Sequence, residues 1–500
     1  MGETKSSKAS KNHKIMNLQL TVILAGTAAS LALASTGAAQ VTADALLNKL
    51  VQRGILKEDE AEALKNESPT NDAGGMKFKI SDAIKSMELY GDLRFRFEYR
   101  SGELGPGQGY DVADRWRYAL RIGVRGDLTD DFYYGLRLET SSNERSTWNT
   151  FGNAGGSGQS PYVGPFSKAN NYTLYVGLAY LGWRPAPWLD VSIGRVPQPL
   201  YTTPMVWDSD YTPEGAVEKV KWTAGRADLF GNFAQLVYQD TTPSDGAQAF
   251  AGTPDGAYLF SSQIGASYRI NKDVSVKIAP VLYNYLGNGK PSAAFSGVFV
   301  GQGTNGLNYA SNATTSSSLP TLNQTGINNL FIFELPAEVN FKLGSLDARV
   351  FGDFAVNLEG NQRAAAAFHA APGAFPGGVQ RGQDNAWQFG MATGNNLGLA
   401  YGSAPKKGTW EARAYWQHVE QYALDPNLLD SDFFEGRGNL EGLYTAFAYS
   451  ISDAIIGTLR YGWAERIDSN LGTGGFNADL PLPNPITKYQ VLQVDVTWKF

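Results

Sequence analysis

The amino-acid sequence predicts an all-β fold, a transmembrane antiparallel β-barrel of sixteen strands. Three observations predict it. Sixteen strand-like segments follow residue 87, and the connectors between them alternate between long and short. Within the segments, apolar side chains alternate with polar ones, as expected where one face of a sheet meets lipid and the other meets water. The segments run to about eleven to fifteen residues, enough for the roughly 9–11 that a tilted transmembrane strand requires.

The chain begins with a predicted signal peptide, residues 1–39. Four lysines precede a mostly apolar run at residues 18–34, and small residues follow it up to Ala39, which is the order found in secretory signals. A membrane helix is the alternative, but the run is rich in alanine and threonine and lacks a stop-transfer flank. No other stretch approaches the roughly 18 apolar residues of a spanning helix. The exported chain is therefore expected to reach a membrane without a helix to hold it there.

Residues 40–75 are predicted to form a periplasmic helical segment and linker. Leu46 and Leu50 stand at helical spacing, and the Asn- and Gly-rich stretch 71–75 indicates a flexible joint. The sequence leaves two interpretations open: a plain linker, or a helix pair that oligomerises or tethers the protein to the envelope. The barrel is predicted to occupy residues 76–500.

The first strand shows how the two faces of the barrel wall are assigned. Leu93, Phe95 and Phe97 share one parity, which is assigned to lipid. The charged parity is assigned to a water-filled lumen, because a single arginine at the bilayer midplane would cost on the order of 2–4 kcal/mol. An open sheet edge in hydrocarbon would leave N–H and C=O groups unpaired, so the first and sixteenth strands must pair. The lumen-facing residues of this strand are Glu88, Asp92, Arg94, Arg96, Glu98 and Arg100.

The connectors predict the topology. In outer-membrane barrels short turns face the periplasm and long loops face outside, and an even strand number returns both chain ends to the same side. A hairpin within 287–327 would raise the count to eighteen. The segment Tyr172–Trp183 is apolar on both parities, which suggests a wall that faces a partner subunit. The long loops are predicted at 101–114, 142–171, 197–213, 241–256, 287–327, 359–382, 423–438 and 468–486, and the short turns include Gly402–Gly408.

Composition argues against several classes of function. The chain contains no cysteine, which excludes disulfides and thiolate sites. Its net charge of −6 becomes −9 without residues 1–39, with 38 basic against 47 acidic residues, and this opposes a nucleic-acid role. The three histidines are dispersed, and no G-x-S-x-G, H-E-x-x-H or P-loop motif is present. We therefore expect no enzyme activity, no cofactor and no metal site.

The chain resembles the Gram-negative outer-membrane porins. Its terminal Phe500 is similar to the aromatic residue by which outer-membrane proteins are recognised for assembly, and Leu89–Glu98 resembles the first strand of these porins. The motifs at 194–195, 206–208 and 213–215 are similar to a third external loop. The resemblance is closest to a "putative porin" family that carries a short helical segment before the barrel. It implies an outer-membrane location in contact with lipid, a homotrimer, and an external loop that folds into the pore.

This resemblance implies a pore constriction at the loop 197–213. Asp208, Asp210 and Glu214 lie in or beside that loop, and the lumen parity of the first three strands supplies a basic wall. An acidic loop opposite a basic wall would produce a transverse field, and rings of charge set ion preference. The sequence leaves open a second interpretation, in which these arginines brace the barrel interior by pairing with acidic residues. The residues of the basic wall are Arg94, Arg96, Arg115, Arg117, Arg121 and Arg137.

The function expected from these features is passive diffusion of small hydrophilic solutes and ions through a water-filled channel. Three alternatives stay open. The barrel could be a substrate-selective channel for sugars or anions, or a non-conducting surface or structural barrel whose loops do the work. The chain could also be a secreted soluble β protein.

Overall fold

The structure is a computed structural model, and its barrel lies within the unit Ala83–Phe500. The predicted signal peptide, 1–39, and the predicted helical segment, 40–75, lie outside the described residues. Within the described part of the chain, no helix is long and apolar enough to cross a membrane. The described residues are 81–103, 109–141, 146–151, 173–239, 257–286, 308–309, 322–323, 329–370, 377–425, 428–434, 436–473 and 486–500.

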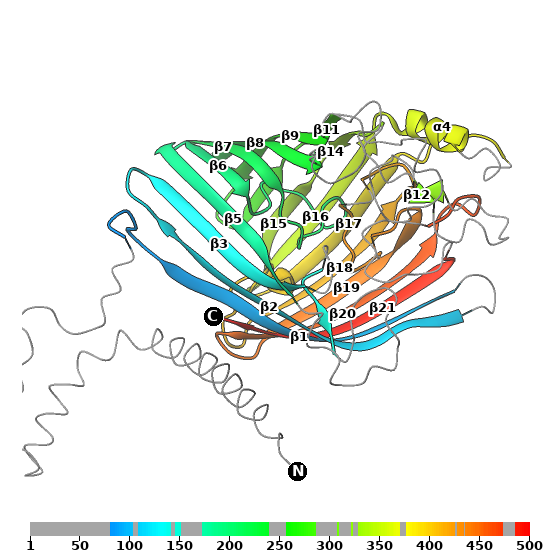
Figure 1. Ribbon diagram of the computed structural model, residues 1–500. Coiled ribbons are helices and arrows are strands. Elements are labelled where there is room, and N and C mark those ends of the chain that lie inside the picture. Colours follow the sequence, from blue (N-terminus) through cyan, green and yellow to red (C-terminus); the bar gives the residue numbers. More distant parts are fainter. Residues whose placement is uncertain are drawn as a thin grey trace, which may run out of the picture. The chain divides into compact units, whose positions relative to one another are not determined.

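Sixteen antiparallel strands form the barrel wall in these residues (Figure 1). Two of them carry two labels each because Pro280 and Pro336 interrupt them, since proline lacks the N–H that a ladder hydrogen bond requires. The first eight are β1 (Glu88–Glu103), β2 (Gly109–Asp127), β3 (Phe132–Ser141), β5 (Thr173–Ala186), β6 (Leu189–Arg195), β7 (Glu214–Ala224), β8 (Ala227–Gln239) and β9 (Ala257–Arg269). The other eight are β10 (Val274–Ile278) with β11 (Val281–Leu286), β14 (Phe331–Glu334) with β15 (Ala337–Leu343), β16 (Leu346–Asn357), β17 (Asn385–Gly394), β18 (Trp410–Val419), β19 (Leu440–Ser450), β20 (Ile455–Arg466) and β21 (Lys488–Lys499).

The barrel is closed by its two terminal strands. β1 and β21 pair antiparallel from Asp92 opposite Lys499 to Glu103 opposite Lys488. The predicted pairing of the first and last strands is therefore confirmed. Closure leaves no edge whose backbone groups would be unpaired in hydrocarbon.

The eighteen-strand alternative is not realised in the described residues. The connector after β11 contains β12 (Asn308–Tyr309) and β13 (Leu322–Asn323), which pair only with each other in a separate two-stranded sheet. A further two-residue segment, β4 (Asn149–Thr150), pairs beside β2 and does not cross the wall. The wall therefore keeps sixteen strands.

The two faces of the wall follow the predicted parity. Phe95 on β1 and Trp116 on β2 are 44% and 58% exposed on the outside of the barrel. Arg96 and Arg117, one position along on the same strands, are each 2% exposed. On these two strands the arginines therefore lie inside the barrel and the aromatic side chains outside, which is the arrangement that a membrane-spanning barrel requires.

The apolar run on both parities of β5 has a local cause. A β-bulge between Arg137 and Leu138 on the neighbouring β3 leaves Gly177 without a partner in the register. Because of the bulge, an even-numbered residue faces outward before it and an odd-numbered residue faces outward after it. Val176 and Leu181 are accordingly both exposed, at 47% and 43%. The bulge therefore contributes to the apolar pattern that suggested a partner subunit.

Short turns and the C-terminus lie at one end of the barrel, and the long connectors lie at the other (Figure 1). One of the long connectors contains the helix α4 (Gly360–Ala370). The long loop predicted at 101–114 is wrong in extent, because β1 continues to Glu103 and β2 begins at Gly109. A hairpin can extend beyond the bilayer without apolar alternation, so the side-chain pattern ends before the hydrogen-bonded strands do.

The turn predicted at Gly402–Gly408 is also different in the structure. β17 ends at Gly394 and β18 begins at Trp410, so the connector is 395–409. It contains the one-turn 3-10 helix η4 (Leu399–Tyr401). This connector is much longer than the other turns at its end of the barrel, which join strands such as β15 and β16 through only Gly344 and Ser345.

Candidate functional site: the lumen and its inward-folded loops

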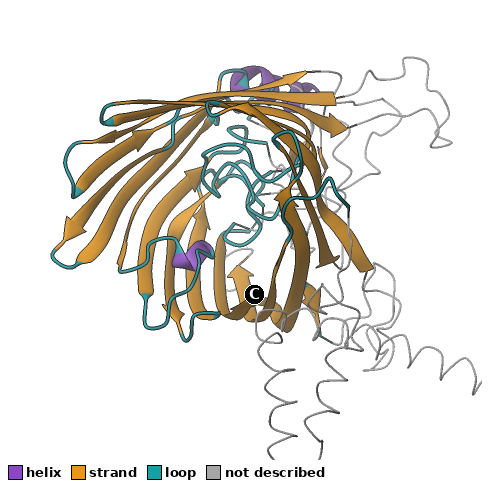
Figure 2. Ribbon diagram, turned by 90° about the vertical axis from the view of Figure 1, so that its left-hand side faces the viewer, coloured by secondary structure: helices purple, strands orange, loops and turns teal. Residues whose placement is uncertain are grey.

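The connector between β6 and β7, residues 196–213, folds into the lumen. Figure 2 shows loops inside the ring of strands. The backbone N–H of Tyr201 donates to Oε1 of Gln263 at 2.9 Å, and the Tyr201 hydroxyl donates to Oε2 of Glu338 at 2.8 Å. Thr202 Oγ1 donates to Oε1 of Glu334 at 2.6 Å. Because these acceptors lie on β9, β15 and β14, the loop spans from its own strands to a distant part of the wall.

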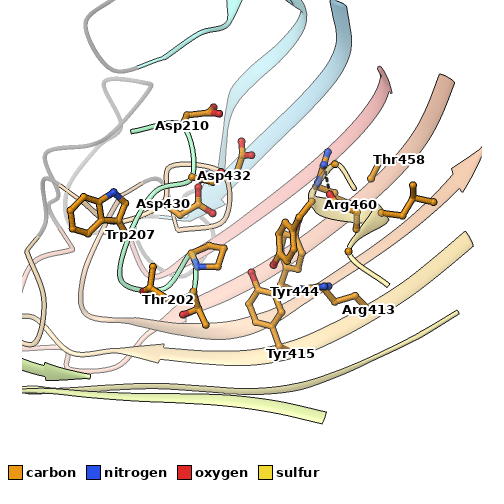
Figure 3. Close-up of a pocket in the computed structure, with 18 of the residues that line it drawn as sticks. Thr202, Trp207, Asp210, Arg413, Tyr415, Asp430, Asp432, Tyr444, Thr458 and Arg460 are labelled. Carbon is orange, nitrogen blue, oxygen red and sulfur yellow. Dashed lines mark hydrogen bonds between the residues drawn. The ribbon is translucent and has the colours of Figure 1, made fainter. Parts of the chain in front are cut away.

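Apolar packing fixes the same loop. Met205 and Trp207 are fully or almost fully buried, in one cluster with Val217, Leu259 and other lumen-facing residues of the wall. The Trp207 ring centroid lies 6.3 Å from that of Tyr283 on β11 (Figure 3 labels Trp207). Burial of this much aromatic surface makes the inward position stable rather than one of several loop conformations.

A second connector, residues 420–439 between β18 and β19, also folds inward. Leu424, Leu428 and Phe433 are each at most 4% exposed. The N–H of Asp208 donates to the carbonyl of Leu428 at 2.7 Å, and the N–H of Ser431 donates to Oδ2 of Asp208 at 3.3 Å. The two inward loops are therefore joined to each other inside the barrel.

The loops and the wall enclose a cavity of about 470 Å³. Asp210, Asp430 and Asp432 come from the two loops and lie on one side of it, and Arg413 and Arg460 come from β18 and β20 and lie on the other (Figure 3). Between these groups stand the stacked tyrosines of the wall, Tyr415 and Tyr444, with ring centroids 4.8 Å apart.

The structure divides the predicted basic wall into two groups. Arg94, Arg96 and Arg121 line the cavity; Arg115, Arg117 and Arg137 are not among its lining residues. Each of the six makes an ion pair with an acidic residue. The shortest pairs are Arg94–Asp92 at 2.7 Å, Arg96–Asp432 at 2.7 Å, Arg115–Glu98 at 2.5 Å, Arg117–Glu98 at 3.7 Å, Arg121–Asp92 at 2.8 Å and Arg137–Glu139 at 2.9 Å.

Glu98 is the acidic partner of Arg115 and Arg117, two of the arginines that do not line the cavity. Its side chain is fully buried, and its carboxylate lies 2.9 Å from Arg100 and 2.5 Å from Arg115. Arg117 and Arg96 complete the cluster at 3.7 and 3.8 Å. One carboxylate among four guanidinium groups joins β1 and β2 inside the wall, which is the bracing arrangement that the sequence left open.

The three predicted acidic residues occupy different environments. Asp210 lines the cavity with its carboxylate 3.6 Å from Arg121. Asp208 is 4% exposed and is used as a hydrogen-bond acceptor that holds the two loops together. Glu214 stands at the start of β7, where its exposed side chain pairs with Arg195 at 3.0 Å, and it is not among the lining residues.

Two further aspartates of the loop 420–439 belong to the site and were missed from the sequence. Enclosure by the loops raises the pKa of Asp430 well above its ordinary value, and the neighbouring Asp208 and Asp432 raise it further. Enclosure would also raise the pKa of Asp432, but Arg96 and Arg460 outweigh it and hold that pKa below its ordinary value. Asp432 therefore loses its proton more readily than Asp430.

The sequence contained a weak signal that the loop of Asp430 and Asp432 packs inside the barrel. The predicted loop 423–438 contains the apolar pairs Leu428-Leu429 and Phe433-Phe434 among acidic residues. Such pairs are out of place in a solvated external loop and are typical of a segment that packs on a core. The arginines of β18 and β20 stand on the lumen parity of their strands, as the parity rule would have placed them.

The described residues include no group of three or more histidine, cysteine or carboxylate side chains that could hold a metal ion. His418 on β18 stacks on Trp387 and lies 2.9 Å from Glu441. These neighbours belong to the outer face of the wall, outside the cavity.

Comparison with known proteins identifies the family. The sequence family described as "Putative porin" matches residues 108–500. The chain belongs to this family. It is an outer-membrane porin of a Gram-negative bacterium, and its fold and family indicate a channel rather than an enzyme. The predicted family, barrel and location are therefore confirmed.

Solved structures give a more distant likeness. One is described as "Asymmetric conductivity of engineered proteins", and others are engineered variants of the porin of Rhodopseudomonas blastica. Each is 11% identical, with TM-scores of 0.36–0.37, and the match covers 83% of this chain and 100% of the other. No curated protein matches the chain.

Proposed function

We propose that the porin passes small hydrophilic solutes and ions down their gradients through a constriction formed by the loops 196–213 and 420–439. One observation carries this proposal: Asp210, Asp430 and Asp432 of the loops lie on one side of a cavity in the lumen, and Arg413 and Arg460 of the wall lie on the other. The cavity, about 470 Å³, is far larger than the roughly 10–15 Å³ that a single water molecule requires in this measure. A hydrated small solute fits such a space, and no covalent step is required.

The opposed charges would act on solutes as a transverse field. Asp432 and Asp210 supply negative charge, and Arg413 and Arg460 supply positive charge from the opposite side. Arg94 and Arg121 add positive charge to the cavity lining beside Asp92 and Asp210. A field across the narrowest point orients dipolar solutes, and the balance of fixed charge sets the preference between cations and anions. Arg100, Arg115 and Arg117, which pair with Glu98 and do not line the cavity, support the wall in this proposal and do not themselves select ions.

Ion selectivity tests the role of the lining arginines. The double variant Arg94→Gln, Arg121→Gln is expected to shift permeability towards cations. A full charge about 8 Å from a permeating ion changes its energy by about 0.5 kcal/mol in water, so each replacement should change the permeability ratio by roughly twofold. Reversal potentials in a salt gradient across a planar bilayer measure this ratio.

A matched control is available on the same strand. Arg125 is an exposed arginine of β2 that pairs with Glu88 and is not among the cavity-lining residues. Arg125→Gln should leave the reversal potential unchanged. Equal reversal potentials for the wild type and the double variant would refute the proposed role of Arg94 and Arg121.

A substrate-selective channel for sugars or anions is the second candidate. The observation that favours it is that two tyrosines and two arginines line the same cavity: Tyr201, Tyr401, Arg349 and Arg413. Aromatic and guanidinium groups together can bind sugars and anions. Conductance that saturates with solute concentration, or that a solute blocks, would favour this candidate. A linear response would favour general diffusion.

We also propose a homotrimer, on the basis of the family resemblance and of one outward-facing carboxylate. Glu218 stands in the middle of β7, on the face opposite the buried Val217 and in register with the outward-facing Phe233. Its carboxylate has only a long contact, 3.5 Å, with Gln235. A carboxylate on the outward face in the middle of a strand is unfavourable against lipid and favourable against a partner subunit. Crosslinking in detergent should then give a trimer band.

The proposal also covers the residues that precede the barrel, 1–75. Residues 1–39 are proposed as a signal peptide, and residues 40–75 as a periplasmic segment that links or tethers the barrel. N-terminal sequencing of the mature protein would test the cleavage site after Ala39. A mature chain that retains residues 1–39 would contradict it.

A further inference from the structure

The connector 395–409, at the short-turn end of the barrel, lies at the rim of the lumen, against the wall (Figure 2). Gly398 to Gly402 line the same cavity as the two inward loops. The carbonyl of Ala400 accepts a hydrogen bond from Nη2 of Arg460 at 3.0 Å, and the carbonyl of Gly402 accepts one from Nζ of Lys499. Arg460 is on β20 and Lys499 is at the end of β21, whereas the connector joins β17 to β18. The segment therefore extends past β19 to reach side chains two and three strands from its own.

The wall also holds the connector from its own side. The N–H of Ala400 donates to Oε2 of the fully buried Glu411 on β18 at 2.9 Å. The Arg413 guanidinium lies 4.0 Å from the Tyr401 ring centroid. Leu399 and Ala400 are buried at 1% and 2% exposure. These contacts fix η4 against the wall.

Two glycines permit this path. Gly398 and Gly402, on either side of η4, have φ angles of 95° and 86°. Only glycine adopts these left-handed values without a steric cost. A Cβ at Gly398 would also approach Oγ of Ser403 to 2.4 Å. The conformation is therefore specified locally by the sequence as well as by its distant contacts.

We propose that the connector 395–409 forms an inner constriction at the periplasmic end of the pore, in series with the constriction of the external loops. The cavity is then a chamber with two narrow ends. The inference deepens the proposed function and rests on it. The outer end is bordered by loop carboxylates, and the inner end by the backbone of η4 and the Tyr401 side chain.

The inner constriction selects by size rather than by charge. Its own lining residues, Gly398 to Gly402, carry no ionisable group other than the tyrosine hydroxyl. Three cations of the wall touch it: Arg413 lies over the Tyr401 ring, and Arg460 and Lys499 each donate to one of its carbonyls. These cations stay on the wall when the connector is removed. Removal of the connector should therefore widen the pore and change its ion preference much less than substitutions at the outer constriction.

Shortening the connector tests the proposal directly. In one variant, residues 396–407 are replaced by a two-residue Asn-Gly turn, which suits a β-hairpin. Two similar constrictions in series share the resistance, so single-channel conductance should rise up to about twofold. Larger neutral polymers should also enter the pore from the periplasmic side. The reversal potential in a salt gradient should stay close to that of the wild type.

Point variants keep the test decisive if the shortened barrel fails to assemble. Tyr401→Ala should raise the conductance and Tyr401→Trp should lower it, because the side chain borders the bore. Lys406→Gln, an exposed change in the same connector that does not border the cavity, is the matched control and should have no effect on conductance.

The outcomes separate this inference from the proposed function. If the wild type conducts and both the shortened variant and the Tyr401 variants conduct equally well, the inner constriction is refuted and the porin function stands. A large shift in reversal potential without a change in polymer exclusion would also overturn it. If the wild type forms no pore, the proposed function itself fails.

Discussion

Shortening the loop 196–213 is expected to raise single-channel conductance by about two- to threefold, because this loop fills part of the lumen. Replacing residues 199–210 by a short Gly-Ser linker removes its contacts with Gln263 and Glu334. The base of the loop permits the change, since the N–H of Val196 donates to the carbonyl of Pro213 at 2.8 Å. Planar-bilayer recording measures the result.

A pair of tryptophan variants refines this prediction. Trp207 is 2% exposed and anchors the loop inside the lumen, whereas Trp188 is 53% exposed on the turn between β5 and β6. Trp207→Ala removes buried packing of the order of 3–5 kcal/mol and should produce a noisier channel with a higher mean conductance. Trp188→Ala should conduct like the wild type. Unchanged conductance after both the loop deletion and Trp207→Ala would show that this loop does not narrow the pore.

Glu98→Gln is expected to lower the free energy of unfolding of the barrel by about 3–5 kcal/mol. Removing one member of a buried ion pair leaves its partners uncompensated, and the loss has this order of magnitude. Here the remaining charges are Arg100, Arg115 and Arg117, which all lie within 3.7 Å of the Glu98 carboxylate. Urea unfolding of the refolded protein in lipid vesicles measures the change.

An exposed ion pair supplies the comparison. Asp347 and Lys342 pair beside the turn between β15 and β16, at 40% and 47% exposure. Asp347→Asn should change stability far less, because exposed pairs contribute little. If Glu98→Gln and Asp347→Asn unfold at the same urea concentration, the Glu98 cluster does not brace the wall.

The wall of the barrel could be predicted from the sequence because lipid imposes a pattern of period two on every strand. Phe95 and Arg96 have to face opposite ways, and closure has to bring β1 to β21. Family resemblance then indicated the inward loop that contains Asp208 and Asp210. These features depend on local alternation or on short motifs, which a single sequence displays.

The second inward loop and the inner connector could not be predicted in the same way. The contact between Asp208 and Leu428 joins residues 220 positions apart, and the contact of Gly402 with Lys499 joins residues 97 apart. No periodic pattern encodes such pairings. The sequence could not show which arginines line the cavity for the same reason. Arg94 and Arg121 line it only because Asp210 and its loop are brought beside them.

The central claim is that a water-filled lumen, narrowed by inward-folded loops, conducts. Single-channel recording of the purified wild-type protein in a planar bilayer tests it most directly. We expect discrete conductance steps that occur in groups of three and increase when residues 199–210 are removed. Protein that inserts as a folded barrel and yet produces no steps would contradict the account.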